Sequence, residues 1–438
     1  MATPLQNTQH ARAMSKFSLS SFMVIMSQLF LSSTALAQDE RPVSVLDLPR
    51  EGYEPVNVRL GPVTVAPTLD MKLEYDNNIF AQPFDKVGDT VFTATPRLKF
   101  AYDNEKLLWS AEASSSFYRY FDNKSENHTG FLLNTGLTLK GKTSNAGVNG
   151  GFERTYENRN DPEARKLIGK GPRLFNIATA EGFYSVQGAR VGLSAKATVQ
   201  KYNFLSNVDD ERDFTSLRGS LRGTYRVSGP INMFGQIFAN RRAFRLNVDA
   251  SGVNRDAKSY GALIGAQIDP GGKVRGEFGV GIVHLNPKDN AIKGYTGAEV
   301  LGTIVYNLRP RTAVTLDLFR GDVATVRNGA SGRVDSRIRL GVQQEVRHNL
   351  LMSGGIGWRE THFRAVPDGK QRTLGVDGEV EYLLNRGISV ALTSRYSKRT
   401  ADIPATGPSP NVIVKNGVRR SVDAFERFRI GMDVRFKL

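Results

Sequence analysis

Arginine recurs at every second or fourth position in several stretches of this chain, and its guanidinium groups could bind anions. The clearest stretches are 216–226, 333–347 and 427–435. A guanidinium group holds a carboxylate or a phosphate through two parallel hydrogen bonds. A row of such groups offers many weak sites, which favours passage of an anion over its tight retention. We expect ten arginines to line such a path: Arg218, Arg222, Arg226, Arg337, Arg339, Arg347, Arg395, Arg427, Arg429 and Arg435.

Carboxylates alternate in step with these arginines, so a second interpretation stays open. Asp335, Glu345 and Asp433 share the alternating positions of their own stretches. Arginines that are each paired with an acid would keep an interior wet and rigid without attracting anions. The whole chain has 59 Lys and Arg against 43 Asp and Glu, and this excess favours the first interpretation.

Catalytic chemistry has little support. After residue 37 the histidines are His128, His284, His348 and His362, and no pair has the spacing of helical metal ligands. The chain has no cysteine and no Gly-x-Ser-x-Gly motif. We therefore expect no enzyme activity, catalytic residue, metal or cofactor. His362 beside Glu360 is the pair that would suit an enzyme site.

The alternation itself predicts the elements that position these side chains. In 425–438 apolar and charged residues alternate almost without interruption. Side chains of a β-strand point to opposite faces with a period of two, so this segment has one apolar and one charged face. Long helical periodicity is not convincing anywhere, and no run of eighteen apolar residues predicts a transmembrane helix.

The start of the chain has the features of an export signal. Lys16 precedes a mostly apolar run, 17–31, and Ala35-Leu36-Ala37 is a small-x-small cleavage site. We predict a secretory signal peptide at 1–37 and a mature chain from Gln38. Met14 is an alternative initiator.

Short turns alternate strictly with longer polar connections along the rest of the chain, which predicts eighteen strands. The turns are rich in Gly, Pro, Asn and Asp, as hairpin turns are. This rhythm is typical of an all-β, antiparallel up-and-down transmembrane barrel with short periplasmic turns and long extracellular loops. We expect a periplasmic segment at 38–60 and the barrel at 61–438. A soluble β-sandwich or β-helix would need shorter and more numerous strands. The expected long connections are 77–88, 121–127, 157–172, 205–211, 245–255, 285–290, 327–332, 364–369 and 400–422.

Aromatic residues gather near the strand ends, which predicts two interfacial rows. Near short turns we expect Tyr102, Trp109, Tyr225, Tyr306, Tyr382 and Phe436. Near long loops we expect Tyr75, Tyr118, Tyr156, Phe244, Phe363 and Tyr396.

The C-terminal strand resembles the β-signal of bacterial outer-membrane proteins. The matching residues are Arg429, Gly431, Val434 and Phe436: a polar residue, a glycine two positions later, and two apolar residues separated by one. The match ends two residues before the C-terminus, with Lys437-Leu438 following. The resemblance implies recognition by the barrel-assembly machinery.

The mature N-terminal region resembles the outer-membrane putative β-barrel porin 2 family of alphaproteobacteria. The resemblance lies in Arg59-Leu60-Gly61, Pro67-Thr68-Leu69 and Tyr75-Asp76-Asn77-Asn78-Ile79-Phe80. It implies the outer membrane of a Gram-negative bacterium and a link to exopolysaccharide export. With the arginine pattern it predicts a passive channel for anionic solutes, with export of an acidic exopolysaccharide as the expected case. The alternatives are a general diffusion porin and a sealed structural or adhesive barrel.

The expected partners follow from this location. They are outer-membrane lipid, the barrel-assembly machinery, an anionic polysaccharide, and a periplasmic export partner that contacts 38–60; a place for 38–60 in the pore mouth is the alternative. A net charge of +16 is spread along the chain without a basic helix, so nucleic acid is not expected. Lys415, Arg419 and Arg420, in connection 400–422, are candidates for a constriction or lid, unless that loop is a mobile surface loop.

Overall fold

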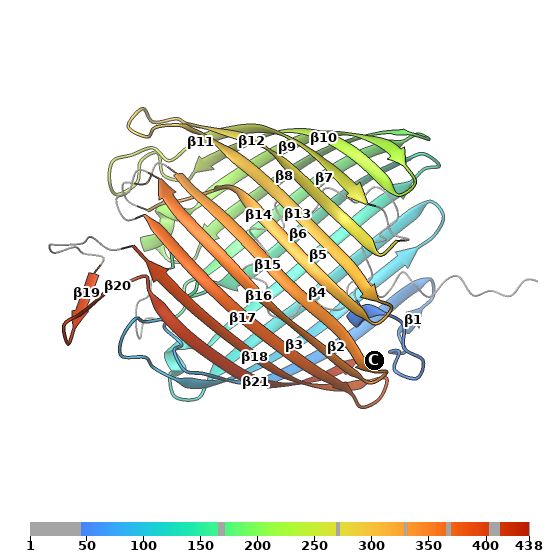
Figure 1. Cartoon of the computed structure of the whole chain (residues 1–438), viewed down its shortest axis with the longest axis horizontal. Helices are drawn as coiled ribbons and strands as arrows, with labels where there is room; N and C mark the ends of the chain where they lie inside the picture. The colour runs from blue at the N-terminus through green and yellow to red at the C-terminus, as the bar shows by residue number, and fades with distance from the viewer. Residues whose placement is uncertain are drawn as a thin grey trace, which may run out of the picture.

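The chain forms a closed antiparallel β-barrel of eighteen long strands (Figure 1). This computed structural model describes residues 45–164, 171–268, 272–327, 330, 332–364, 369–402 and 412–437, so the predicted signal peptide lies outside it. Each long strand pairs with the next, and β21 (Phe425–Lys437) pairs with β2 (Val63–Asp76) to close the ring. The predicted eighteen-stranded up-and-down barrel is confirmed.

The strands between β2 and β21 are 12 to 16 residues long. They are β3 (Asp89–Asp103), β4 (Leu107–Tyr120), β5 (His128–Lys140), β6 (Ser144–Tyr156), β7 (Leu174–Gln187), β8 (Val191–Phe204), β9 (Phe214–Ser228), β10 (Ile231–Phe244), β11 (Ala257–Ile268), β12 (Val274–Pro287), β13 (Tyr295–Arg309), β14 (Thr312–Val323), β15 (Gly332–Arg347), β16 (Leu350–Arg364), β17 (Lys370–Leu383) and β18 (Ile388–Ala401).

The short turns lie at one end of the barrel and the long connections at the other. In the turn after β3, Oδ1 of Asn104 accepts hydrogen bonds from the backbone N–H groups of Lys106 and Leu107, at 2.9 and 2.7 Å. Gly229, in the turn after β9, has a φ of +49°, which favours glycine. Residues 269–271, between β11 and β12, lie outside the described residues. Short turns of outer-membrane barrels face the periplasm, which orients the molecule.

The two faces of the wall differ as the alternation predicts. Large apolar side chains point outward and are exposed, among them Ile237 (59%), Ile264 (68%) and Ile282 (61%). An apolar outer surface of this kind is stable in lipid and not in water. Charged residues such as Arg333 and Asp335 point inward and are buried.

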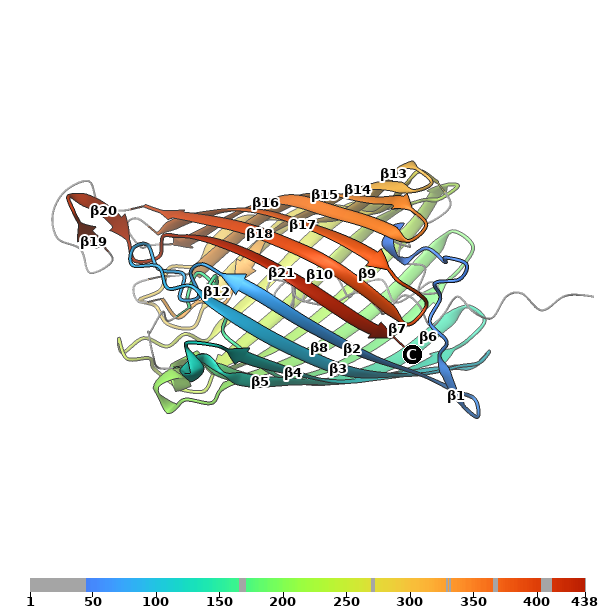
Figure 2. The same cartoon turned by 90° about the horizontal axis from the view of Figure 1, so that it is seen from below.

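Several short elements accompany the barrel. The 3-10 turns η2 (Lys124–Glu126) and η3 (Asn207–Arg212) lie in long connections, and β1 (Val58–Leu60) forms an antiparallel hairpin with the start of β2 at the short-turn end. The hairpin of β19 (Val412–Lys415) and β20 (Val418–Ser421) projects from the opposite end (Figure 2). Within the described residues, no helix has the length and apolar character needed to cross a membrane.

Three tyrosines of the aromatic row predicted at the short turns are exposed on the outer face, as that prediction requires. The prediction for the row at the long loops was partly wrong. Tyr225, Tyr306 and Tyr382 are 49%, 39% and 45% exposed. At the long-loop end, Tyr118 instead stacks on His128, with ring centroids 4.4 Å apart, and Phe363 is fully buried. Packed loops fill the interior at that end, so aromatic side chains find a buried environment there.

Candidate functional site

On three neighbouring strands, β8 to β10, every charged residue of the inward face is basic. The cross-strand register places these residues on one face. They are Lys196, Arg218, Arg222, Arg226 and Arg242. Carboxylates come from other strands: Glu181 lies 2.7 Å from Lys196, and Glu277 lies 2.7 Å from Arg222. Arg218 and Arg242 also have carboxylate partners, Glu299 and Asp322. In this arc, which we call the basic arc of the lumen, four of the five cations are thus paired with carboxylates of other strands.

Two arginines of the basic arc lie over aromatic rings of β10. The guanidinium carbon of Arg218 is 4.1 Å from the ring centroid of Phe238, and that of Arg222 is 3.7 Å from the centroid of Phe234. A guanidinium group is attracted to a ring face, and this stacking fixes its plane. The rings therefore hold both arginines in fixed orientations along the wall.

The closing seam carries a second group of the predicted arginines. Nε of Arg427 donates to Oδ2 of Asp76 on β2 at 2.8 Å, and both side chains are buried. Arg429 lies 3.6 Å from Glu74. Removal of a charge from water is costly unless an opposite charge compensates it. The first and last long strands are therefore joined by ion pairs in addition to their backbone ladder.

Two further predicted arginines on this side are also paired. Nη1 of Arg435 lies 2.8 Å from Glu379 and 3.2 Å from Glu381. Nη2 of Arg339 donates to Asp377 at 2.7 Å. The charge-paired interpretation therefore describes these positions well.

The other predicted pore arginines lie on the same inward faces. Arg395 stands opposite Arg429 and Asp377 in the register. Arg337 lies over Phe319, 4.3 Å from its ring centroid. Arg226 and Arg347 are exposed and lie near the short-turn end. The ten predicted arginines therefore occupy two arcs, on β9 and on β15 to β21.

The described residues of the connection between β6 and β7, 157–164 and 171–173, reach across the lumen. Its Glu163 accepts hydrogen bonds from the hydroxyl of Thr325 at 2.5 Å and from the backbone N–H of Arg327 at 3.1 Å. The same carboxylate lies 3.1 Å from Nη1 of Arg333 on β15. These contacts attach the connection, which we call the crossing loop, to a distant part of the ring.

Residues beside Glu163 attach the crossing loop to the closing side of the barrel. Nη1 of Arg427 donates to the side chain of Asn160 at 3.0 Å. The backbone carbonyl of Asp161 accepts from Nη1 of Arg399 at 3.3 Å, and its carboxylate lies 3.7 Å from Arg333. The crossing loop thus narrows the lumen where basic residues of β15, β18 and β21 meet.

The carboxylate of Asp161 is ionised in this setting. Burial alone would raise the pKa of Asp161, but the charges of Arg333 and Arg359 outweigh it. Its pKa is therefore lowered from the ordinary value. The sequence pattern predicts a long connection at 157–172 and indicates no role for it. Its length and its acidic residues were the available signals.

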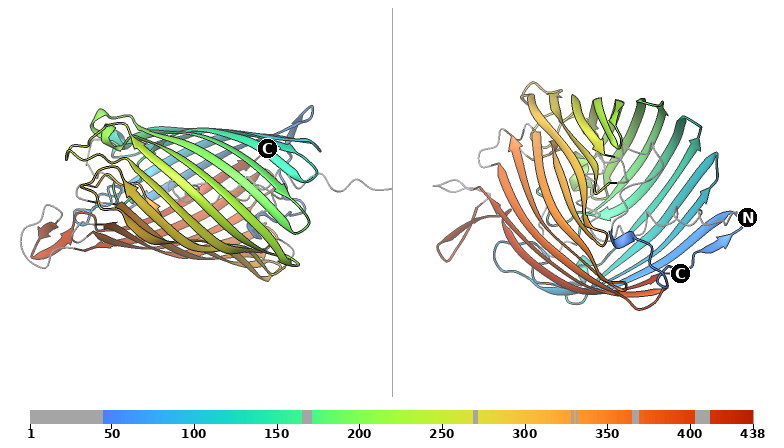
Figure 3. Two further views of the ribbon diagram at one scale, coloured as in Figure 1. Left: turned by 90° about the horizontal axis from the view of Figure 1, so that it is seen from above. Right: turned by 45° about the vertical axis from the view of Figure 1, so that its right-hand side comes forward.

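The segment before the barrel enters the lumen at the short-turn end. Val45, in η1 (Val45–Asp47), packs against Val305 and Ala313 on the inner wall and is 2% exposed. Nη2 of the buried Arg50 lies 3.4 Å from Glu345 on β15. Figure 3 shows η1 within the outline of the barrel wall. We call residues 45–54 the mouth segment.

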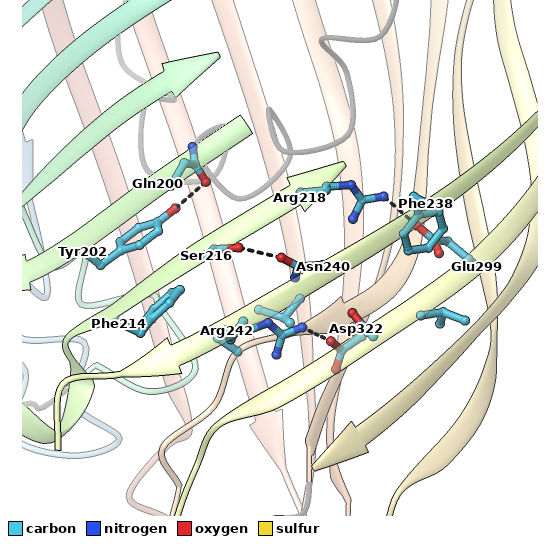
Figure 4. A pocket seen from close by; sticks show the side chains of 14 residues that line it. Gln200, Tyr202, Phe214, Ser216, Arg218, Phe238, Asn240, Arg242, Glu299 and Asp322 are labelled. Atoms are coloured by element: carbon cyan, nitrogen blue, oxygen red, sulfur yellow. Dashed lines mark hydrogen bonds and ion pairs between the residues drawn. The ribbon is translucent and has the colours of Figure 1, made fainter. Parts of the chain in front are cut away.

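A pocket in the inner wall, near the long-loop end, contains aromatic, amide and charged side chains (Figure 4). The hydroxyl of Ser216 donates to the side chain of Asn240 at 2.8 Å, and Arg242 pairs with Asp322. Glu299 is 2% exposed and lies 3.9 Å from Nη2 of Arg218. Each of the two arginines, Arg242 and Arg218, thus has one carboxylate partner in the pocket. The pocket therefore adds no net charge to the wall.

The three loop residues predicted to form a constriction lie at the outer rim. Lys415 lies in β19, and Arg419 and Arg420 lie in β20, the two strands of the projecting hairpin. Lys415 pairs with Asp85, and Nη1 of Arg420 donates to the carbonyl of Pro83 at 3.0 Å. The hairpin thus contacts the connection after β2, whereas the crossing loop narrows the lumen. Residues 403–411 of the same connection lie outside the described residues.

The remaining candidates are the His362–Glu360 pair, a metal site and the assembly-signal residues. Glu360 pairs with Arg372 at 3.3 Å, so it is engaged away from His362. Across the described ranges, no cluster of three or more His, Cys, Asp or Glu could hold a metal ion. Arg429, Gly431, Val434 and Phe436 all lie in β21, the closing strand.

Comparison with known proteins decides the family. The family model described as "Putative beta-barrel porin 2" matches residues 51–420. The chain belongs to this porin family. The location that goes with it is the outer membrane of a Gram-negative bacterium. A search of curated proteins found no match for this porin.

Solved structures similar to this porin are outer-membrane proteins at low identity. OccK2 (OpdF) of Pseudomonas aeruginosa has a TM-score of 0.44 and 10% identity over 87% of this chain and 99% of its own. OccK9 (OpdG) of the same species has a TM-score of 0.44 and 12% identity over 85% and 98%. OmpT of Vibrio cholerae has a TM-score of 0.36 and 11% identity over 87% and 100%.

Proposed function

We propose that this outer-membrane porin is a passive, non-enzymatic channel for anionic solutes, with an acidic exopolysaccharide on its way out of the cell as the substrate class. The main support is the basic arc of the lumen, where the inward faces of β8 to β10 carry five cations and no carboxylate of their own. Four of these cations pair with carboxylates of other strands, and Arg226 is the fifth. Cations along a path with low-dielectric walls concentrate anions. A long polyanion would meet several arginines in succession, each holding it weakly.

Arg226 offers the sharpest test of selectivity, because no ion pair of this exposed arginine occurs among the described residues. Replacing Arg226 with Glu should lower the anion-to-cation permeability ratio by about twofold, since it reverses one charge of the arc. Reversal potentials in planar bilayers under a salt gradient measure this ratio. Lys398→Gln, on the outward face of β18, is the matched control and should change nothing. A cation-selective native channel would contradict the proposal.

A sealed structural barrel is the second candidate, and the crossing loop and mouth segment favour it. Both lie in the lumen and contact its wall. A sealed barrel gives no single-channel conductance, even after both segments have been removed. A channel closed only by these segments would conduct once they were gone.

The substrate class needs a test in cells. A deletion strain should lose acidic polysaccharide from its surface and regain it when the native gene is restored. Normal surface polysaccharide together with anion-selective conductance would identify a general diffusion porin. Cross-linking from residues 45–54 in the periplasm would show whether an export partner reaches this segment.

A further inference from the structure

Five cations on the outer face of the wall gather at the long-loop end of β4 to β11. They form what we call the outer basic arc: Arg119, Arg154, Lys201, Arg241 and Lys258. Their direction follows from the register. Arg154 stands opposite the lipid-facing Phe131, and Arg241 opposite the exposed Leu217. Side chains one position away, such as Asn240, point into the lumen.

Acidic residues on the same strands all face the other way. β4 to β12 are fully described, and their acidic residues are Glu112, Glu153, Glu181 and Glu277. Each stands in register with inward residues: Glu112 faces Lys99, and Glu277 on β12 contacts Arg222 on β9 along the inner face of the wall. The outward faces of these strands therefore carry cations without a strand-borne carboxylate.

Arg241 and Lys258 form a like-charge pair within the outer basic arc. They stand directly opposite each other on β10 and β11, and both are exposed. Like charges directly opposite in a sheet destabilise it. Among the described residues, neither side chain has an ion pair. An anion bound between them would remove this repulsion.

The closing side of the barrel provides a contrast at the same height. Outward Arg372 lies 3.3 Å from Glu360 and 3.1 Å from Asp402. Lys398 stands opposite Glu426 in the register of β18 and β21. Arg372 and Lys398 therefore have carboxylates nearby on their own face, unlike Arg241 and Lys258.

Apolar side chains lie on the same outer face, toward the middle of the membrane. Phe117, Val199 and Tyr260 lie two residues from Arg119, Lys201 and Lys258, and they are 37%, 41% and 54% exposed. Two residues of strand span about 7 Å. A ligand that suits both levels has anionic groups above and hydrocarbon chains below. An isolated phosphate ion would use the upper level alone.

We propose that the outer basic arc binds the phosphate groups of lipid A in the outer leaflet, with its acyl chains on the apolar wall below. Arg241 and Lys258 would share one phosphate, to which guanidinium and ammonium donate charge-assisted hydrogen bonds. Arg119, Arg154 and Lys201 would extend the contact around the barrel. The arc lies outside the lumen, so this binding is independent of the proposed transport.

Native mass spectrometry of the folded mature chain in detergent, with lipid A carrying both phosphates, tests the proposal. The double variant Arg241→Gln with Lys258→Gln should retain about tenfold less of this lipid than the native barrel. Arg372→Gln with Lys398→Gln removes two outward cations elsewhere and should retain the native amount. Lipid A stripped of its phosphates should bind the native barrel about tenfold less well.

Three outcomes would overturn the proposal. They are equal retention by the Arg241 and Lys258 variant, an equal loss in the Arg372 and Lys398 control, and full displacement by excess inorganic phosphate. Shifted gel mobility after heating confirms folding of each variant. Should the first variant not fold, Arg119→Gln with Lys201→Gln replaces it with the same expectation. Ion selectivity in bilayers should stay unchanged in all of them, which separates this result from the test of transport.

Discussion

Single charged side chains in the lumen act through the partner that each one meets. Arg427 is buried with Asp76 and also holds Asn160 of the crossing loop. Arg429, two residues along the strand, has its nearest carboxylate oxygen at 3.6 Å. The two arginines share a face and a strand, yet the loss of each should have a different cost.

Replacing Arg427 with Gln should lower the free energy of unfolding by about 3 kcal/mol, because Asp76 would remain buried without its counter-charge. Urea unfolding of the barrel in liposomes measures the change. Arg429→Gln serves as the control and should cost clearly less. An equal loss of unfolding free energy in the two variants would show that the Arg427–Asp76 pair contributes no more than Arg429 with Glu74.

The lowered pKa of Asp161 makes attachment of the crossing loop depend on pH. Its stabilising contribution is complete above the pKa of an unfolded aspartate, about 3.9, and is lost as the pH falls through the lower pKa of the folded protein. We expect the loop to detach in acid, below about pH 4, with a rise in conductance.

Single-channel recordings from pH 7 to pH 2 test this dependence. Asp161→Asn should raise conductance already at pH 7 and remove the acid step. Persistence of the same acid step in Asp161→Asn would assign it to another group.

At the scale of elements, the residue pattern was enough to predict the strands. Connections 77–88 and 121–127 fill the gaps between β2 and β3 and between β4 and β5 without remainder. Lipid on one side and charge on the other impose a period of two that is visible locally. The end of β14 was harder, because its ladder with β13 stops at Arg320 while β14 continues to Val323.

The path of the crossing loop could not be predicted from its own residues. Glu163 meets Arg333, 170 positions later, and no local periodicity encodes that contact. Packing of Val45 on Val305 is of the same kind. Arginine positions indicated the inward face correctly, but their partners depend on strands that are distant in the sequence.

Gly431 in the closing strand provides a prediction at this scale. A Cβ at Gly431 would lie 2.9 Å from the carbonyl oxygen of Leu73. That oxygen belongs to the backbone of β2, so it cannot move away without disturbing the strand pairing. Gly431→Ala should therefore reduce the folded fraction of barrel in membranes, by about 1–3 kcal/mol of stability. Protease protection after membrane fractionation measures that fraction.

Gly223→Ala is the matched control for Gly431→Ala, because a Cβ there would meet nothing within 4 Å. The assembly-signal hypothesis predicts a separate effect for Phe436. Its side chain faces the lipid and contributes little to the pairing of β21 with β2. Phe436→Ala should slow insertion without lowering stability afterwards. Normal insertion of both Gly431→Ala and Phe436→Ala would contradict the assembly-signal hypothesis, without affecting the assignment of the barrel fold.

At the scale of the whole molecule, two segments lie in the lumen at different distances from its short-turn end. The mouth segment lies at the short-turn end, and the crossing loop contacts the wall nearer the long loops. Buried ion contacts attach both: Arg50 with Glu345 for the mouth segment, and Arg333 with Glu163 and Asp161 for the crossing loop. A solute must pass both.

Deleting residues 45–54 from the mature chain should raise single-channel conductance by about twofold, since it widens the periplasmic mouth. The barrel should still fold, because its ladder begins after this segment. Arg50→Gln should give a smaller rise with more frequent switching between levels. Unchanged conductance in the deletion would place the narrowest point at the crossing loop.

The seam between β2 and β21 has a consequence for the order in which the molecule forms. Asp76 and Arg427 are 351 residues apart, so their meeting has a large loop-closure entropy and few local contacts to guide it. Hairpins between neighbouring strands form at short range, which leaves the seam for the final step. Until then the molecule is an open curved sheet with two unpaired edges, the most aggregation-prone state available to it. The crossing loop, held by residues of both β15 and β21, reaches its final place only when that sheet has curled into a ring.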